Sequence, residues 1–287
     1  MDWLNAIVQG VLLGGLYALF AAGLSLIFGV MRLVNIAHGD FIVLGSYLAL
    51  VVVQSLGLNP FVAALIVVPL MAALGYVLQR VLLNPTLGKD LLAPLLVTFG
   101  LSIIIQNGLL TLFTADSRRI MAGGIETASV SIGALNLGVL PLAMFATALA
   151  VILGLEFIFT RTSLGRAFRA TSDDAEIAKL MALDNRHIYA MAMALSAAIV
   201  ALAGIFLAVR TNFDPSTGPM RLIFGFEAVI IGGLGSLWGT LAGGVVLGVA
   251  QTLGALIDPG YQVLAGHLVF FLILIFRPRG LFPRMDG

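Results

Sequence analysis

Long apolar stretches recur along this chain, and they constrain its fold more strongly than any other feature. A helix of about 20 predominantly apolar residues crosses the hydrocarbon core of a bilayer, so each stretch predicts a membrane helix. The stretches cover Leu4–Val30, Ile36–Leu56, Phe61–Leu83, Pro94–Phe113, Val139–Phe159 and Ile188–Val209, followed by a tract from Leu222 to Ile257 and by Tyr261–Phe276. The tract is too long for one span. We predict an all-α polytopic membrane protein with about eight transmembrane segments, some broken or re-entrant, in one membrane domain over residues 1–287.

The composition supports this class. Hydrophobic residues make up 60% of the chain and charged residues only 10%, whereas soluble domains carry roughly a quarter charged residues. The 33 glycines suit close helix packing in lipid. A net charge of +1 argues against a nucleic-acid partner. With no cysteine there is no thiolate nucleophile or thiolate metal ligand.

The distribution of Lys and Arg predicts the orientation, because cytoplasmic loops carry an excess of both. The loop Thr160–His187 holds five of them, and the C-terminal tail holds Arg277, Arg279 and Arg284. We expect both segments to be cytoplasmic and Thr114–Gly138 to be a loop on the outer face. The N-terminus is then also outside, although a re-entrant glycine-rich segment would change this parity.

A cluster of four polar residues interrupts the first, mostly apolar third of the chain. Arg32, Asn35, His38 and Asp40 fall within nine residues of the stretch Gly29–Gly45. Burying such side chains in hydrocarbon costs several kcal/mol unless they are paired or wetted. They lie either in a short aqueous loop or along a polar path through the membrane, and the sequence leaves both open.

A second interruption lies in the other half, where Gly225–Gly244 echoes Gly29–Gly45. Its centre, Gly232–Gly239, predicts two short helices that meet at a glycine-rich break. Broken segments in corresponding halves are the sequence sign of a substrate path, although glycine is common in membrane helices anyway. The predicted path residues are Asn35, His38, Gly39, Asp40, Gly232, Gly233, Gly235 and Ser236.

The cytoplasmic loop predicts a short exposed helix. Ser172 is a suitable N-cap for a first turn that holds Asp173, Asp174 and Glu176, since acidic residues are favourable there. Alanines at helical spacing form a small-residue face, and Ile177, Leu180 and Met181 share the same spacing. Such a face favours docking into a groove of a partner protein. The alternative is a helix lying on the lipid headgroups, which usually carries more Lys and Arg.

The sequence argues against an enzyme. It contains no G-x-x-x-x-G-K-[ST] phosphate loop, and its three histidines are scattered without metal-ligand spacing. Glu156, Glu227 and His267 are candidate relay residues of a gradient-driven carrier, but both glutamates lie near segment ends and are expected to reach water. The mid-segment amides of Gln106, Asn107 and Gln251 are expected to hydrogen-bond between helices.

Several motifs resemble one permease family. The segment Gly15–Phe41, which reads GLYALFAAGLSLIFGVMRLVNIAHGDF, resembles the N-terminal signature of LivH-type permeases, the membrane subunits of branched-chain amino acid ABC importers. The likeness continues through Thr98–Asn107, through Gly165–Ala170, which reads GRAFRA, and through Phe226–Gly239, which reads FEAVIIGGLGSLWG. It covers essentially the whole chain, and the first motif is highly specific.

The resemblance implies a permease without cofactors in the bacterial cytoplasmic (inner) membrane. Its partners would be a LivM-like second permease or a second copy, two ATP-binding subunits of the LivG and LivF type, and a soluble amino-acid binding protein. The alternative is a gradient-driven transporter or channel for small polar solutes such as urea or amides. One departure is Ala182-Leu183, where the family usually has Gly-Ile or Gly-Val. The implied ATPase-coupling residues are Gly165, Arg166, Arg169, Asp173, Asp174, Ala175, Ala178 and Ala182.

Overall fold

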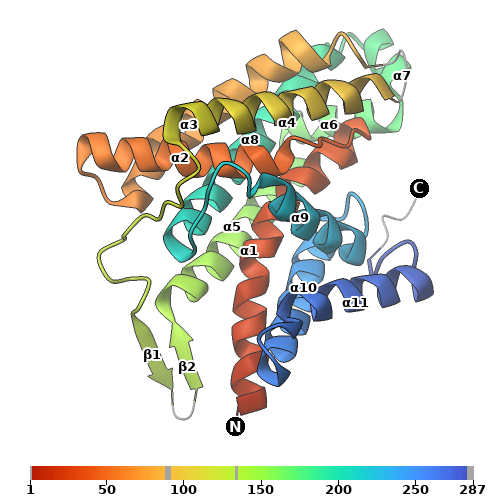
Figure 1. The fold of residues 1–287 in the computed structure, drawn as a ribbon. Coiled ribbons are helices and arrows are strands. Elements are labelled where there is room, and N and C mark those ends of the chain that lie inside the picture. Colours follow the sequence, from red (N-terminus) through yellow and green to blue (C-terminus); the bar gives the residue numbers. More distant parts are fainter. Residues whose placement is uncertain (1, 88–91, 133–134, 283–287) are drawn as a thin grey trace.

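The computed structural model describes residues 2–87, 92–132 and 135–282, and these ranges are mostly helical (Figure 1). Arg284 of the basic tail lies outside them. In chain order the elements are α1 (Asp2–Met31), α2 (His38–Leu56), α3 (Pro60–Leu78), the π-helical turn η1 (Gln79–Leu83), α4 (Leu92–Phe113), β1 (Ser129–Ile132), β2 (Leu135–Gly138), α5 (Val139–Arg161), α6 (Ser163–Asp173), α7 (Ala175–Leu180), α8 (Asn185–Arg210), α9 (Gly218–Gly232), α10 (Leu237–Ile257) and α11 (Tyr261–Phe276).

Seven helices in the described part of the chain are long and apolar enough to cross a membrane, which confirms the prediction of an all-α polytopic membrane protein. They are α1, α2, α3 with η1, α4, α5, α8 and α10, and the shorter apolar helix α11 follows them. The apolar tract does split at its glycines, with α9 ending at Gly232 and α10 beginning at Leu237. The prediction of two short helices is right for α9, which has 15 residues, and wrong for α10, which has 21.

Polar residues at helix starts explain several of these boundaries. The Asn59 side chain accepts a hydrogen bond from the Phe61 amide, and Pro60 occupies the first turn of α3, where its missing N–H costs nothing. Asp184 caps α8 and Ser236 caps α10 in the same way. The predicted outer loop contains more order than expected, since β1 and β2 pair antiparallel with Ser129 opposite Gly138.

Helix α1 is the centre of the core, and glycine lets α10 pack closely against it. A Cβ added at Gly14 would lie 2.5 Å from the Val245 Cα, and one at Gly248 would lie 2.3 Å from the Gly10 carbonyl oxygen. Both helices carry glycines four residues apart, at Gly10 and Gly14 on α1 and at Gly244 and Gly248 on α10. In a membrane, packing rather than hydrophobicity drives helix association, so small residues at the contact supply the close approach.

The two ends of the helix bundle are defined by the segments that lie there. Helices α6 and α7 lie beside the end of α1, where the Ser172 hydroxyl donates to the Gly29 carbonyl oxygen at 2.7 Å. The tail after α11 lies beside the end of α9, with the Leu281 amide donating to Ile231 at 2.8 Å. We call this the basic end. The N-terminus and the β1–β2 hairpin lie together at the other end, which we call the hairpin end (Figure 1).

Candidate translocation site

Helix α2 begins well inside the bundle rather than at its surface. After α1 ends at Met31 the chain turns back along α1, with Arg32 in the left-handed region at φ 52°. His38, the first residue of α2, then places its Nε2 2.8 Å from the Phe20 carbonyl oxygen of α1. Phe20 is 11 residues before the end of α1, about 16 Å along its axis. The first polar interruption is therefore a return segment that starts α2 at mid-depth.

Three of the four polar residues of this segment, Asn35, His38 and Asp40, are buried, whereas Arg32 is exposed. Two of the buried residues bond to backbone groups. Asn35 is 0% exposed, and its Oδ1 accepts a hydrogen bond from the Ala37 amide at 3.0 Å, which stabilises the turn before α2. The Ile36 amide donates to the Thr98 hydroxyl of α4 at 3.3 Å. His38 and Asp40 are each 1% exposed. Together with the His38 contact to α1, these bonds hold the break in shape.

The start of α9 meets the start of α2. A Cβ added at Gly39 would lie 2.0 Å from the Gly218 carbonyl oxygen, and one at Gly218 would lie 2.1 Å from Asp40 Oδ1. We call this contact the α2–α9 junction. Helix N-termini carry partial positive charge, so the Asp40 carboxylate lies beside two of them. Only glycine permits this approach, because any side chain at either position would occupy space already filled by backbone or by the carboxylate.

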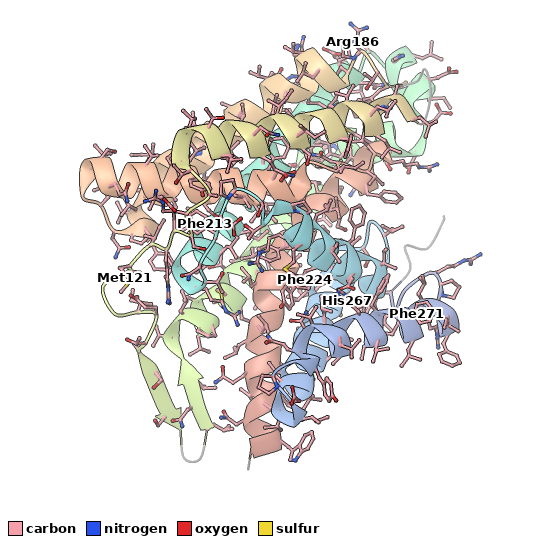
Figure 2. The ribbon with its side chains drawn as sticks, viewed as in Figure 1. Met121, Arg186, Phe213, Phe224, His267 and Phe271 are labelled. Atoms are coloured by element: carbon pink, nitrogen blue, oxygen red, sulfur yellow. The ribbon has the colours of Figure 1, made fainter. Side chains whose placement is uncertain are left out.

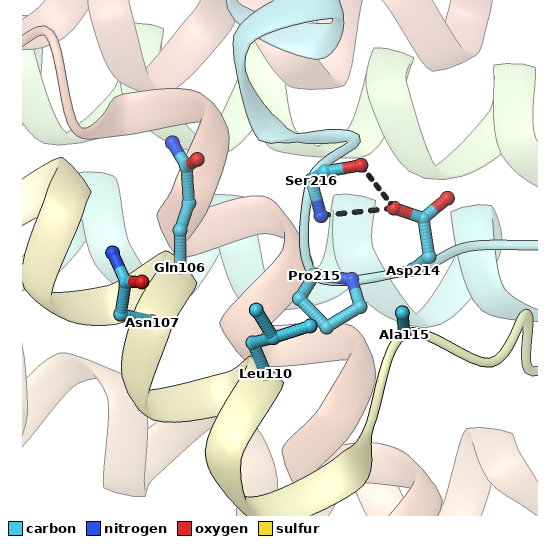
Figure 3. A pocket seen from close by; sticks show the side chains of 7 residues that line it. All are labelled: Gln106, Asn107, Leu110, Ala115, Asp214, Pro215 and Ser216. Carbon is cyan, nitrogen blue, oxygen red and sulfur yellow. Dashed lines mark hydrogen bonds between the residues drawn. The ribbon is translucent and has the colours of Figure 1, made fainter.

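A pocket of about 390 Å³ lies next to the junction (Figure 3). Gln106 belongs to its wall and also reaches the junction, because its Nε2 donates to Asp40 Oδ1 at 3.0 Å. On the opposite side the Asp214 Oδ1 accepts from the Ser216 amide at 2.9 Å, which shapes the loop between α8 and α9. Pockets of this size hold small molecules. The lining residues are Gln106, Asn107, Leu110, Ala115, Asp214, Pro215 and Ser216.

The second glycine break lies elsewhere. Gly233 and Gly235 have φ of 108° and 78°, a region that favours glycine, and the Ser236 hydroxyl accepts from the Gly239 amide at 3.1 Å to begin α10. A Cβ at Gly29 would lie 3.6 Å from the Gly235 Cα, so this break sits beside the last turn of α1, at the basic end. Helix α9 separates it from the junction by about 21 Å.

The predicted path residues thus form two groups rather than one. Asn35, His38, Gly39 and Asp40 lie at the α2–α9 junction, and Gly232, Gly233, Gly235 and Ser236 lie at the opposite end of α9. Sequence reasoning predicted an outer loop over Thr211–Arg221 but did not assign Gly218 or the pocket residues of this loop to the site. The Thr-Gly-Pro at the start of α9 is a signal for them, because proline is favoured in the first turn of a helix.

The mid-segment amides follow the expectation in part. Gln106 of α4 bonds Asp40 of α2, and Gln251 of α10 accepts from the Tyr17 hydroxyl of α1 at 2.5 Å, so both join helices. Asn107 instead donates to the Ile103 carbonyl oxygen of its own helix at 2.8 Å. The Asn107 side chain is exposed, although the rest of α4 is apolar enough for the helix to cross a membrane.

The loop Thr160–His187 forms two helices, α6 and α7, where one was predicted. Ser172 is not an N-cap but lies inside α6; the caps are Thr162, which accepts from Gly165, and Asp174, which accepts from Glu176 and Ile177. Helix α6 packs on the end of α5 so tightly that a Cβ at Gly165 would lie 2.1 Å from the Ile158 carbonyl oxygen. The Arg169 guanidinium donates to the Phe159 carbonyl oxygen and strengthens the same corner.

The outward face of α7 carries large apolar side chains. Ala178 is 2% exposed and packs against the chain itself, whereas Leu180 is 86% exposed and Met181 75%. Ala182, in the left-handed region at φ 62°, ends the helix, and the Leu183 amide donates to the Ala178 carbonyl oxygen at 3.1 Å. Arg166, Asp173 and Asp174 are exposed, and Ala175 is half-buried. The prediction that the small-residue face points outward is therefore wrong for Ala178, because that face packs against the chain and leaves the large apolar side chains exposed.

In the described residues, seven helices are long and apolar enough to cross a membrane, and the starts of α2 and α9 meet beside a pocket. These features define the class of multi-pass membrane permeases. Residues 6–277 match the family described as the permease component of the branched-chain amino acid transport system. The match spans nearly the whole chain, so the protein belongs to this family. Members of this kind are transport subunits and not enzymes.

Three relatives illustrate the family. The chain is 30% identical to the high-affinity branched-chain amino acid transport system permease protein BraD of Pseudomonas aeruginosa, over 99% of this chain and 97% of BraD. It is 29% identical to LivH of Escherichia coli (strain K12), over 99% and 96% of the two chains. It is also 27% identical to LivM of the same organism, over 93% of this chain and 68% of LivM. Among solved structures, it resembles a chain of PsaBC from Streptococcus pneumoniae in complex with Fab, with a TM-score of 0.49, 16% identity and coverage of 96% and 92%.

Proposed function

We propose that this chain is one of two permease subunits of an ABC importer that moves branched-chain amino acids, or related hydrophobic amino acids, into the cytoplasm. The observation that carries the proposal is the α2–α9 junction with its adjoining pocket. The family match over residues 6–277 supports the same assignment. The names of BraD and LivH support the substrate class. The bacterial inner membrane is the location that follows for such a subunit.

The second permease subunit is a LivM-like chain or another copy of this one. Helix α4 supports such a partner, because Gly100 and Gly108 have no other group of the described chain within 4 Å of their Cβ positions. The exposed Asn107 amide lies on the same helix, and a polar group facing hydrocarbon without compensation costs several kcal/mol. A protein surface or a water-filled path therefore covers this face in the assembled importer.

Energy comes from two ATP-binding subunits of the LivG and LivF type, since the sequence contains no phosphate loop of its own. They dock at the basic end, on α6, α7 and the residues around them. The exposed Leu180 and Met181 enter a groove of the ATPase, and Arg166, Asp173 and Asp174 surround the contact. Gly165 and Arg169 tie α6 to α5, so movement of the docked helices is transmitted to a membrane helix.

The substrate arrives at the hairpin end from a soluble amino-acid binding protein. In the path, the pocket amides and the helix N-termini at the junction offer weak polar contacts to a zwitterion without binding it tightly. Asn35, His38, Gly39 and Asp40 hold the junction in shape. The part of the path near the cytoplasm is formed by Gly232, Gly233, Gly235 and Ser236. Glycine backbone has no Cβ to restrict it, so this segment changes conformation readily.

Uptake by the assembled complex in proteoliposomes tests this function. Labelled leucine should enter only with ATP at the ATPase side and binding protein at the other, and should continue when ionophores collapse all ion gradients. Gradient-dependent uptake without ATP would instead support a secondary transporter. Leu180→Asp should abolish stimulated ATP hydrolysis and uptake, because it places a charge in the docking contact. Met121→Asp, in the predicted outer loop and also strongly exposed at 70%, is the matched control and should leave ATPase docking intact.

A further inference from the structure

An ionisable pair joins α9 and α11 inside the membrane region. His267 Nδ1 is hydrogen-bonded to Glu227 Oε1. Glu227 is only 4% exposed, so the expectation that it reaches water was wrong. It is the tenth of the 15 residues of α9, and His267 is the seventh of the 16 residues of α11. Ionisable groups so far from helix ends are costly in a membrane and are usually functional.

Two aromatic rings, Phe224 and Tyr17, lie on one side of the pair. The Phe224 ring stacks on the His267 ring with centroids 6.3 Å apart and planes at 24°, and it also contacts the Tyr17 ring at 5.3 Å. Figure 2 labels Phe224 and His267 close together, with Phe271 farther along α11. Phe271 is 56% exposed. The pair therefore lies beside rings that suit an aliphatic side chain and, at their faces, a cation.

The geometry differs from a purely structural bridge. A bridge between two helices gains most when both carboxylate oxygens are bonded. Here Glu227 Oε2 is buried and has no hydrogen-bond partner in the described residues, and the His267 side chain is 43% exposed. With Nδ1–H donated to the carboxylate, Nε2 of this partly exposed ring is left as an acceptor. Two acceptors of a negatively charged pair, Glu227 Oε2 and His267 Nε2, thus have no donor among the residues that the structure describes.

We propose that the Glu227–His267 pair binds the α-ammonium group of the amino acid in transit, with Phe224 against its aliphatic side chain. This rests on the proposed function above and names the contact by which the path recognises an amino acid. The ammonium supplies three N–H donors and a positive charge, which match a carboxylate oxygen and an imidazole nitrogen. Neutral solutes such as urea and simple amides lack that charge, so the pair discriminates against them.

Binding to the purified permease–ATPase complex, without the binding protein, tests the contact directly. Labelled leucine should bind saturably. Leucinamide, which keeps the ammonium and lacks the carboxylate, should compete with it, and 4-methylpentanoate, which lacks the ammonium, should compete at least about tenfold less well. Equal competition by the two analogues, or no saturable leucine binding, would overturn the proposal with the wild-type protein alone.

Variants then assign the contact to the pair. Glu227→Gln keeps the shape and removes the charge, and it should weaken leucine binding about tenfold or more while the complex still elutes intact and hydrolyses ATP. His267→Gln should act in the same direction, and Glu156→Gln on α5 is the matched carboxylate control. Unchanged leucine binding in either pair variant would refute the assignment. If wild-type uptake proves independent of ATP, the proposed function fails, whereas ATP-driven uptake with normal binding in Glu227→Gln overturns only this inference.

Discussion

The tightest contact at the α2–α9 junction makes a quantitative prediction for Gly39→Ala. The added Cβ would lie 2.0 Å from the Gly218 carbonyl oxygen, and real Cβ atoms essentially never approach closer than 3.0 Å, so the two helix starts must separate by about 1 Å. Neither side can relax locally, because the obstacle is backbone and the Asp40 carboxylate lies against Gly218. Overpacking of this kind costs about 1–3 kcal/mol, while alanine in a helix returns up to about 1 kcal/mol. We expect a net loss of about 1–2 kcal/mol.

Thermal unfolding of the purified complex, followed by the loss of monodisperse protein on heating, measures this effect. A loss of that size lowers the midpoint by roughly 2–8 °C in a chain of this length. Gly154→Ala on α5 is the control, because no other group of the described chain lies within 4 Å of its Cβ position. It should leave the midpoint unchanged or raise it slightly. If Gly39→Ala and Gly154→Ala behave alike, the junction is not the rigid backbone contact described above.

Two further substitutions test local geometry elsewhere. Ala182→Gly should stabilise the end of α7 by up to about 1 kcal/mol. Left-handed backbone costs alanine about 1–2 kcal/mol, and the larger entropy of glycine in the unfolded chain offsets part of the gain from removing that strain. Slower amide exchange at Leu183 would support this prediction, and faster exchange would contradict it. Ser46→Ala should destabilise the chain by about 0.5–1.5 kcal/mol, since the Ser46 hydroxyl donates to the Gly204 carbonyl oxygen of α8 at 2.7 Å. Ser55→Ala, whose hydroxyl bonds only within the exposed end of α2, should have little effect, and equal losses would argue against the α2–α8 bond.

Membrane helices were predictable because their signal is local. Each span needs about 20 apolar residues, and a polar residue within that run is costly. The ends of the apolar stretches therefore mark the ends of helices, as at Leu56, Phe113 and Ile257. Glycine breaks were predictable for the same reason, since positive φ at Gly233 and Gly235 needs residues without a Cβ. The cap of α7 was not predictable, because Ser172 and Asp174 are both suitable caps, and α6 extends to Asp173 and so includes Ser172.

The candidate site was predictable in its parts and not in its assembly. Asn35, His38, Gly39 and Asp40 stood out because polar groups are rare in apolar stretches. Their partner at Gly218 did not, because a contact across 178 residues leaves no local trace beyond a glycine before a proline. The same holds for Glu227, whose position in α9 suggested access to water until α11 placed His267 against it.

The amino-acid sequence by itself determined that the chain is a helical membrane protein, which segments cross the bilayer, where two of them break, and to which family its motifs belong. These are properties of hydrophobic length and of single residues, and they act without reference to distant parts of the chain. The tertiary structure decided that the start of α2 meets the start of α9, that α7 turns Leu180 outward and Ala178 inward, and that Glu227 is buried against His267. Each of these depends on close packing between helices far apart in sequence, which hydropathy does not encode.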